Sequence, residues 1–502
     1  MPTAIIIGSG FAGLSTASFL AKDGWNVTVL EKHDIPGGRA RNFEAEGFTF
    51  DMGPSWYWMP DIFERYFNQF GKKVSDYYSL RRLDPSYRVY FKDSELDIPA
   101  DYHSLKNLFE QVEPGSGEQL DRFMEEAAYK YQVGINKLVF KPGRSLSEFM
   151  DMDLLKGLFR LDVFTSISEH VRRHFKDSRL IELMEFPVLF LGALPEKIPA
   201  LYSLMNYADV RLGTWYPDGG MYKIVEGMHA LAAELGVSFK FQTEVRKLIT
   251  KNGCVTGIHT NKGDFNADVV ISGADYHHTE TDLLSQEDRS YSGHYWDKRV
   301  MAPSCLLYYI GINKKLKQVL HHSLFFDTDF SVHGKEIYQT IQWPSDPLFY
   351  VSMTTATDSS GAPSGSENLF FLIPVAAGLT GDTEDLRDTY FDRILSRFEQ
   401  RIGEQIRDHI VFKKSYSIRD FKQDYNAFKG NAYGLANTLL QTAILKPSCR
   451  SKRVRNLFYT GQLTVPGPGV PPSLISGEVV AGQVNKYFSS AKKQTAYDAS
   501  FS

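Results

Sequence analysis

Cysteine is scarce in this chain, and long apolar runs are missing. The three cysteines, Cys254, Cys305 and Cys449, lie far apart and form no CxxC pair. Their scarcity argues against a disulfide framework and against a cysteine-based metal site. No stretch reaches the roughly 18 uncharged apolar residues that span a bilayer. The apolar residues 4–7 are too few for a signal peptide and follow no basic region. We therefore expect a large cytoplasmic globular protein without a metal site.

The chain also lacks a charge excess of either sign. It carries 56 basic and 60 acidic side chains in 502 residues, a net charge of −4. This balance argues against a protein that binds nucleic acid through bulk electrostatics. Aromatic residues are plentiful instead and gather in runs such as 56–59, 186–191 and 200–205. Such runs are either ordinary core or the wall of a long apolar tunnel, and the sequence leaves both open.

The clearest motif is Gly8-Ser9-Gly10-Phe11-Ala12-Gly13. It follows an apolar strand pattern at residues 4–7 and precedes apolar residues at helical spacing. A second strand pattern, residues 27–30, ends in Glu31. This order of strand, glycine turn, helix, strand and acid is the fingerprint of a dinucleotide-binding βαβ unit.

Each part of the motif has a physical task. Gly8 permits the tight turn, Gly10 lets a pyrophosphate approach the backbone, and Gly13 lets the helix pack closely on the strand. The free N–H groups at the start of the helix, with Phe11 and Ala12 in its first turn, favour a bound phosphate. Glu31 follows at the spacing from which a carboxylate accepts hydrogen bonds from the ribose.

The residues after Glu31 extend beyond a simple NAD site. A turn containing Gly37, Gly38, Arg39 and Ala40 follows Lys32, and a second glycine-rich stretch ends in Gly53-Pro54-Ser55. Glycines and an arginine at this place could run N–H groups and a cation along a longer cofactor.

These N-terminal motifs resemble the FAD-binding start of the flavoprotein superfamily of amine oxidases, protoporphyrinogen oxidases, carotenoid desaturases and GDP-dissociation inhibitors. The run 47–55 is most similar to the bacterial carotenoid desaturases of the phytoene desaturase type. The resemblance implies an α/β fold. In it, a Rossmann-like FAD-binding domain is assembled from separated segments, and a mixed α+β substrate domain is inserted.

The C-terminal region resembles the same family. Asn456 to Gly461 reads as a short strand that ends in glycine, and Gly469, Val470 and Pro472 precede a helical pattern. The helix start could present N–H donors to the flavin. The chain departs from the family pattern at four positions, which leaves the substrate and the oxidised bond open: Gln462, Leu463, Val465 and Pro468.

The resemblance also implies a division of the chain. The FAD domain would comprise 1–85, 215–290 and 415–487, and the substrate domain 86–214 and 291–414. In the FAD domain, Val245 would contact the adenine through its backbone, although Val245 could equally be an ordinary residue of a sheet. Asp275 would follow a strand of the FAD sheet. The small, polar residues 488–502 predict a disordered tail.

The family resemblance implies a carotenoid desaturase that transfers a hydride to flavin N5 and loses a proton. Its substrate would be a lipophilic phytoene-like chain or a 1-hydroxycarotenoid oxidised at C3–C4. Two alternatives remain: an amine or protoporphyrinogen oxidase, and a non-catalytic prenyl-binding protein. Asp51 and Asp218 lie near cofactor segments, but no catalytic base can be assigned.

A lipid-soluble substrate also implies contact with a membrane. We expect monotopic, peripheral attachment. The mixed apolar and basic segment 154–164 could lie in the bilayer interface, although an ordinary amphipathic helix is the stronger alternative. A quinone or oxygen would reoxidise the flavin. No second G-x-G-x-x-G occurs, which argues against reduction of the flavin by a bound pyridine nucleotide.

Overall fold

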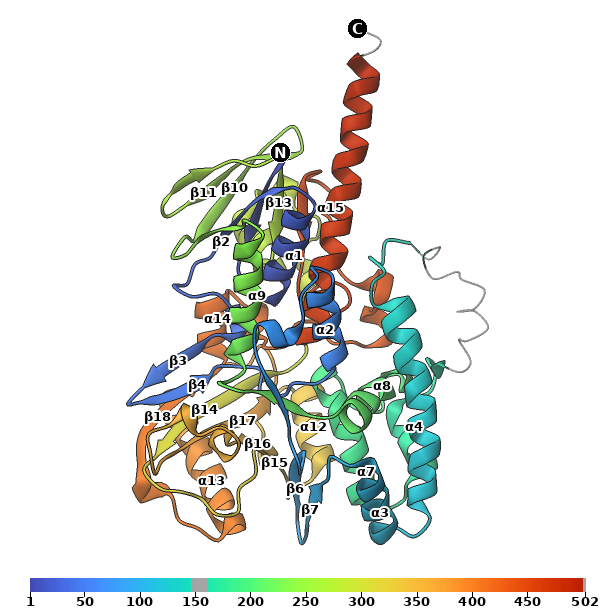
Figure 1. Ribbon diagram of the computed structural model, residues 1–502, viewed down its shortest axis with the longest axis vertical. Helices are drawn as coiled ribbons and strands as arrows, with labels where there is room; N and C mark the ends of the chain where they lie inside the picture. Colours follow the sequence, from blue (N-terminus) through green and yellow to red (C-terminus); the bar gives the residue numbers. More distant parts are fainter. Residues whose placement is uncertain (146–147, 149–160, 500–502) are drawn as a thin grey trace.

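The computed structural model describes all residues except 146–147, 149–160 and 500–502. Most of the expected segment 154–164 therefore lies outside the described residues. The chain folds around two large β-sheets, one above the other along the long axis (Figure 1). A group of helices lies beside the lower sheet. None of the helices in the described part of the chain is long and apolar enough to cross a bilayer.

The upper sheet has five parallel strands in the order β19-β13-β1-β2-β9. At its centre, Ile5 pairs with Thr28 on one side and with Val270 on the other. Strands covered on both faces are apolar along their whole length, which is the pattern that predicted them. The bounds are β1 (Thr3–Ile7), β2 (Asn26–Leu30), β9 (Ser238–Lys240), β13 (Val269–Ser272) and β19 (Leu457–Tyr459).

Three helices pack together beside this sheet, and α1 contacts both of the others. They are α1 (Phe11–Lys22), α9 (Tyr222–Glu234) and α15 (Val470–Ala499). The sequence predicts a disordered tail from residue 488, but the structure continues α15 to Ala499 and away from the body of the molecule (Figure 1). Three alanines and two lysines lie between residues 488 and 499, and both residue types favour helix.

A small antiparallel meander lies next to the upper sheet, formed by β10 (Val245–Lys251), β11 (Cys254–Thr260) and β12 (Gly263–Phe265). The Asn252-Gly253 turn joins its first two strands. Both residues have positive φ, +52° and +68°, as a two-residue hairpin requires. An Asn-Gly pair between two strand-like runs is the typical sequence signal of such a hairpin, so pattern and structure agree here.

The lower sheet has seven strands in the order β18-β14-β17-β16-β15-β6-β7, and only β15 and β6 are parallel. Alternate residues of β14 face opposite cores: Tyr308 packs in the cluster that contains Phe391, whereas Tyr309 packs in the cluster that contains Phe123. The strands are β6 (Tyr87–Phe91), β7 (Glu95–Ile98), β14 (Ser304–Ile312), β15 (His322–Phe326), β16 (Phe349–Ser352), β17 (Glu367–Val375) and β18 (Ile410–Tyr416).

Helices cover both faces of the lower sheet. The helices are α3 (Tyr102–Val112), α4 (Ser116–Val133), α6 (Ile167–His174), α7 (Ser178–Glu185), α8 (Leu204–Tyr207), α12 (Phe330–Tyr338) and α13 (Glu384–Ile402). Two short strand pairs and two further helices connect the halves: β3 (Asn42–Ala45), β4 (Phe48–Asp51), β5 (Leu80–Arg82), β8 (Trp215–Pro217), α2 (Pro60–Asn68) and α14 (Ile418–Tyr425).

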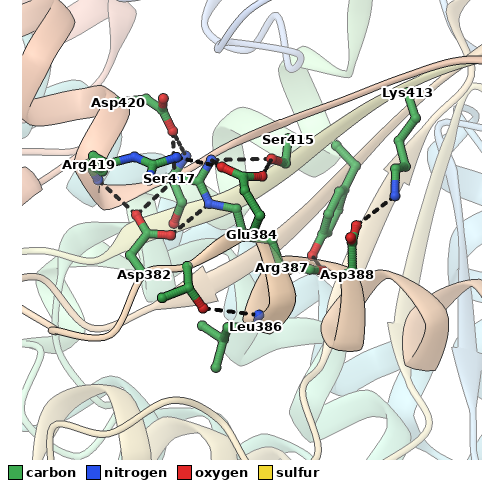
Figure 2. A network of polar contacts seen from close by, with 12 residues as sticks. Asp382, Glu384, Leu386, Arg387, Asp388, Lys413, Ser415, Ser417, Arg419 and Asp420 are labelled. Carbon is green, nitrogen blue, oxygen red and sulfur yellow. Dashed lines mark hydrogen bonds and ion pairs between the residues drawn. The ribbon is translucent and has the colours of Figure 1, made fainter.

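A buried ion-pair network attaches α13 to the lower sheet (Figure 2). The Arg387 guanidinium donates from Nε to Asp382 at 2.7 Å and from Nη2 to Asp420 at 2.7 Å. It also donates to the Ser415 hydroxyl of β18. A buried cation is tolerated when carboxylates match it in this way, and here the matched charges join α13, β18 and α14.

The strands divide between the two sheets as the proposed domains do. All strands of the upper sheet lie within 1–85, 215–290 and 415–487, and those of the lower sheet lie within 86–214 and 291–414, except that β18 continues to Tyr416. The fold class is α/β with an inserted mixed domain, as the sequence predicted. The domain boundaries themselves stay a prediction.

Candidate functional site

The turn between β1 and α1 has the geometry that its glycines predict. Gly8 has φ +91°. A β-carbon on Gly13 would come within 2.1 Å of the Gly8 carbonyl oxygen, so any other residue would push α1 away from β1. A β-carbon on Gly10 would meet no atom within 4 Å. The backbone of Gly10 therefore faces open space, and the N–H groups of the following Phe11 and Ala12 belong to the first turn of α1, where an anion is favoured.

Glu31 directly follows β2, and its side chain contacts this turn. One carboxylate oxygen accepts hydrogen bonds from the Ser9 N–H at 2.8 Å and from the Ser9 hydroxyl at 2.7 Å. The other accepts from the His33 N–H at 2.9 Å. The carboxylate is thus fixed beside the glycine turn. Ser9 was missed as a functional residue, although its place between Gly8 and Gly10 was a signal.

The second glycine stretch lies directly against the first. Gly37 donates its N–H to the Ser9 carbonyl at 2.9 Å, and a β-carbon on Gly38 would come within 3.3 Å of the Gly10 Cα. Gly53 approaches the same stretch, because its β-carbon would come within 2.4 Å of the Arg39 carbonyl oxygen. Ala40 is buried beside them. The structure therefore joins the two motifs that the sequence could only order along the chain.

Arg39 extends from this stretch with part of its hydrogen-bonding capacity unused. Its Nη2 donates to the Asn431 carbonyl at 3.3 Å and its guanidinium lies 5.1 Å from the centre of the Tyr425 ring. Its Nε is buried without a partner. Burial lowers the pKa of Arg39, against the opposing charge of Asp275. A buried, under-used guanidinium is suited to an anionic ligand.

More distant segments converge on the same place. Thr243 donates its N–H to the Glu31 carbonyl at 2.7 Å, which sets the buried Val245 at the start of β10 near the end of β2. The segment before Asp275 reaches Gly8, since a β-carbon on Gly8 would lie 3.6 Å from the Ala274 nitrogen. Asp275 itself accepts a hydrogen bond from the Phe428 N–H at 3.1 Å.

The C-terminal motif meets α1. A β-carbon on Gly461 would lie 3.8 Å from the Ala12 Cβ, and α15 begins at Val470 with Pro472 in its first turn. Gly469 has φ +110° and accepts a hydrogen bond from the Ser473 N–H at 3.0 Å.

Three residues of the predicted site have other surroundings. The Lys32 ammonium donates to the Gln423 carbonyl of α14 at 2.9 Å, which occupies it outside the glycine turn. The Ser55 hydroxyl is within hydrogen-bonding reach of Tyr350 of β16 in the lower sheet, and the preceding Pro54 is half-buried.

Neither carboxylate considered as a base is free for that task. Asp51 accepts hydrogen bonds from the Met221 N–H at 2.8 Å and the Tyr222 N–H at 3.0 Å, at the start of α9. Burial raises the pKa of Asp51 to about 6, and these two hydrogen bonds oppose the rise. Asp218 forms an ion pair with Arg81 at 2.9 Å. Both side chains thus have structural partners.

Two buried polar groups beside the C-terminal loop have no hydrogen-bonding partner. The Lys446 Nζ and the Asn437 Oδ1 are buried without hydrogen bonds. A β-carbon on Gly467 would come within 3.1 Å of the Lys446 Nζ and within 2.9 Å of the Asn437 Oδ1. Burial lowers the pKa of Lys446 to about 7. Nothing in the sequence around Lys446 predicted this placement.

Two adjacent histidines, His321 and His322, form a histidine cluster at the start of β15, with ring centroids 4.4 Å apart. The His322 ring stacks on Trp56, with centroids 4.1 Å apart, and its Nδ1 lies 2.6 Å from the Tyr350 hydroxyl. His322 and His321 each have an Nε2 that is buried without a hydrogen-bonding partner. Burial, and then His321, hold the pKa of His322 well below its usual range, so its ring is neutral.

One cluster in the described part of the chain has the spacing of metal ligands. Atoms of Glu126, His170 and His174 lie within 4.8 Å of one another. The Lys130 Nζ, however, lies 3.4 Å from the His170 Nε2 and 2.8 Å from Asp162. The Lys130 ammonium therefore occupies the position that a metal ion would take. The expectation that the protein has no metal site stays a prediction.

The residues that converge at the β1–α1 turn fit a dinucleotide. Gly10 leaves room for a phosphate, Arg39 has an unused buried donor, and Glu31 is fixed beside the turn. This cradle continues past Gly53 toward Trp56 and the lower sheet, so a second cofactor half could reach the apolar face.

Comparison with known proteins places the chain among flavoproteins. Residues 11–485 match the family of flavin-containing amine oxidoreductases. A carotenoid 3,4-desaturase of Haloarcula japonica is 41% identical over 95% of this chain and 96% of its own. A zeta-carotene-forming phytoene desaturase of Myxococcus xanthus is 31% identical over 95% of this chain and 92% of its own.

Solved structures agree on the fold. An oxidoreductase from Methanosarcina mazei superimposes with a TM-score of 0.61 at 16% identity, over 95% of this chain and 99% of its own. A redesigned putrescine oxidase gives a TM-score of 0.63 at 12% identity, over 97% and 100%. At these identities the likeness concerns the fold alone.

Proposed function

Because this chain belongs to the flavin-containing amine oxidoreductases and, within them, to the carotenoid desaturase family, we propose that it oxidises an acyclic carotenoid to a more conjugated one. The observation that carries the proposal is similarity to carotenoid desaturases along nearly the whole chain. The sequence identity to the carotenoid 3,4-desaturase is 41% over 95% of the chain. A match confined to the glycine turn would support FAD binding alone. The cofactor is FAD, which supplies a hydride acceptor when bound.

Residues of this chain would bind the cofactor, orient the substrate and keep water away from the reacting carbons. The glycine turns, Glu31 and Arg39 would hold the pyrophosphate and ribose of the cofactor. The apolar face of the lower sheet, with Tyr309, Phe370 and the helices that cover it, would hold a hydrocarbon chain and exclude water from the reacting carbons. Trp56 directly follows the loop at Gly53 and belongs to this face, so it would form the boundary between cofactor and substrate.

We propose further that the substrate carries a hydroxyl near one end and is oxidised at C3–C4. A purely hydrocarbon ligand would leave the buried ring nitrogens of the histidine cluster without a hydrogen-bonding partner. Buried polar groups without partners cost free energy, about 1–3 kcal/mol each, and a substrate hydroxyl would remove part of that cost. In a carotenoid hydroxylated at C1 the oxygen is only a few bonds from C3–C4. Its recognition site must then be close to the cofactor, which suits the stacking of His322 on Trp56.

A carotenoid is dissolved in membranes, so we propose that the protein works in the cytoplasm, peripherally attached to a membrane surface. Salt or mild detergent should release it. A membrane quinone or oxygen would accept the electrons from the reduced cofactor. No carboxylate is assigned as the proton acceptor, because Asp51 and Asp218 have structural partners.

Spectroscopy of purified protein and pigments tests this function. The protein should be yellow, with a flavin spectrum, and its expression in cells that accumulate acyclic carotenes should shift pigment absorption to longer wavelength. Gly13→Val, which would clash with the Gly8 carbonyl, should abolish both. Peroxide release with amines or porphyrinogens but unchanged carotenes would favour another oxidase. A colourless protein that binds prenyl chains would favour the non-catalytic alternative.

A further inference from the structure

A groove of about 300 Å³ on the cofactor half is lined almost entirely by cations. Five of its seven lining residues are basic and the other two are serines: Arg144, Arg450, Lys452, Arg453, Arg455, Ser448 and Ser451. The chain as a whole has a net charge of −4, so this concentration is local. The groove lies near the start of β19, at the opposite strand end from the Thr460–Gly461 turn.

Neutral groups hold these cations in place. Arg450 donates from Nε to the Arg455 carbonyl at 3.1 Å and lies 4.5 Å from the centre of the Tyr487 ring. Arg144 donates to the Gln483 side chain at 3.0 Å, and the Lys452 Nζ lies 4.3 Å from the centre of the Tyr291 ring. Carbonyls and ring faces orient a cation without neutralising it.

Within the described residues, no carboxylate pairs with any of these five side chains. The Glu148 carboxylate accepts a hydrogen bond from the Arg144 backbone N–H at 3.2 Å, whereas the Arg144 guanidinium donates to Gln483. Arg387 shows the contrast, since Asp382 and Asp420 match its charge (Figure 2). Burial lowers the pKa of Arg450, and Arg144 and Arg455 lower it further. Clustered, oriented and unmatched cations are suited to an external anion.

Exposed apolar side chains lie beside the groove. Leu440 is 77% exposed and Leu445 is 47% exposed, and the chain enters the groove three residues after Leu445. Val300, 49% exposed, belongs to the same surface, because the Gln441 side chain bonds both its N–H and its carbonyl. Arg144 is next to them, since its neighbour Gly143 packs against the backbone of Ala443. Exposed leucines next to cations are typical of a surface that meets a bilayer interface.

We propose that this basic groove binds the phosphate of an anionic phospholipid, while Leu440 and Leu445 enter the bilayer interface, and that this contact orients the protein on the membrane. The volume admits one phosphate-bearing headgroup and is too small for an extended nucleic acid. The proposal rests on the proposed function, in which the substrate is membrane-dissolved, and it names the lipid that the surface recognises.

Vesicle binding tests the groove. The FAD-loaded full chain is sedimented with vesicles of phosphatidylcholine alone and of phosphatidylcholine mixed with phosphatidylglycerol. The wild type should bind the mixed vesicles more tightly, and salt should weaken that binding. The triple variant Arg144→Gln/Lys452→Gln/Arg453→Gln should lose about 100-fold in affinity for mixed vesicles, at roughly a factor of five per cation. The matched control is Arg246→Gln/Lys247→Gln/Lys251→Gln on exposed positions of β10, which should change affinity by less than about fivefold.

Other outcomes overturn the proposal. Equal binding by the triple variant and the wild type would do so, as would an equal loss in the control, since either result removes the groove from the contact. Inorganic phosphate serves as the soluble probe: if it binds wild type but not the triple variant, and vesicle binding is the same for both, the groove serves a soluble phosphate compound. Carotenoid turnover in detergent micelles should be unchanged in the triple variant. Absence of turnover in the wild type there would contradict the proposed function and leave the vesicle result intact.

Discussion

Gly477 of α15 lies directly against Ser15 of α1. A β-carbon on Gly477 would come within 2.5 Å of the Ser15 Cβ and 2.7 Å of the Thr16 nitrogen, and the Ser15 hydroxyl donates to the Leu474 carbonyl at 2.7 Å. The two ends of the chain therefore meet with backbone against backbone. Because α1 also carries the glycine turn, this contact helps to set the position of the cofactor cradle.

Substitution of Gly477 should separate the two helices. We expect Gly477→Ala to destabilise the protein by about 1–3 kcal/mol through overpacking and to weaken FAD binding, measured by thermal unfolding and by titration of the FAD-free protein. Gly482→Ala is the matched control in the same helix, where an added β-carbon meets nothing within 4 Å. It should stabilise the protein by up to about 1 kcal/mol. Equal effects of the two substitutions would contradict the close contact.

Glu31 should control cofactor affinity. In Glu31→Gln, an amide N–H₂ would face the Ser9 donors, which now share one carboxylate oxygen. We expect FAD to bind about 10–100-fold more weakly, the equivalent of one lost charged hydrogen bond. Flavin fluorescence during titration measures this. The exposed Asp34→Asn removes the same charge three residues away and should leave the affinity within about twofold.

Lys446 should make stability depend on pH. Its pKa in the folded protein is about 7, against an ordinary 10.5, so the unfolded chain binds this proton more tightly. The cost of burial is complete below pH 7 and shrinks as the pH rises toward 10.5. Lys446→Met should therefore stabilise the FAD-free protein by roughly 2–4 kcal/mol at pH 6–7, with a gain that disappears near pH 10. The exposed Lys335→Met should give no such trend in denaturant unfolding, and a gain for Lys446→Met that does not change with pH would rule out this account.

His322 should decide whether a hydroxylated substrate is preferred. His322→Phe keeps a ring on Trp56 but removes both nitrogens. For a pair of acyclic carotenes that differ only in a C1 hydroxyl, we expect kcat/KM to fall about 10–100-fold for the hydroxylated member. It should change little for the other member, which serves as the internal control. An equal fall for both would assign His322 a structural role.

Local patterns of the sequence predicted the cofactor half well. The strand, glycine turn and helix at residues 4–22 depend on neighbours within a few positions, and so does the Asn252-Gly253 hairpin. The C-terminal helix begins at Val470, close to Pro472, as the helical pattern there predicted. A glycine within a helix often indicates the close approach of another backbone, but the sequence does not separate Gly477, which has such a neighbour, from Gly482, which lies on the exposed side of α15 with open space around it.

Contacts between distant segments could not be read from the chain. Asn431 bonds Arg39 from 392 positions away, and Tyr425 comes from the same distant segment. The stacking of His322 on Trp56 requires that the lower sheet meet the cofactor loop, which no local pattern encodes. Lys446 carries no motif at all, because its significance comes only from the missing partners around it.

The upper sheet also constrains how the protein is made. Its strands are contributed by residues near 3, 26, 238, 269 and 457, and β19 and α15 leave the ribosome after all the others. Until then β13 has an open edge and α1 lacks the helix that covers it. Domains of this kind are slow to form, because contacts between distant segments must wait for long loops to close. FAD loading is therefore expected only once translation has passed β19 and α15, whereas the lower sheet, complete by residue 416, can form while the chain is still growing.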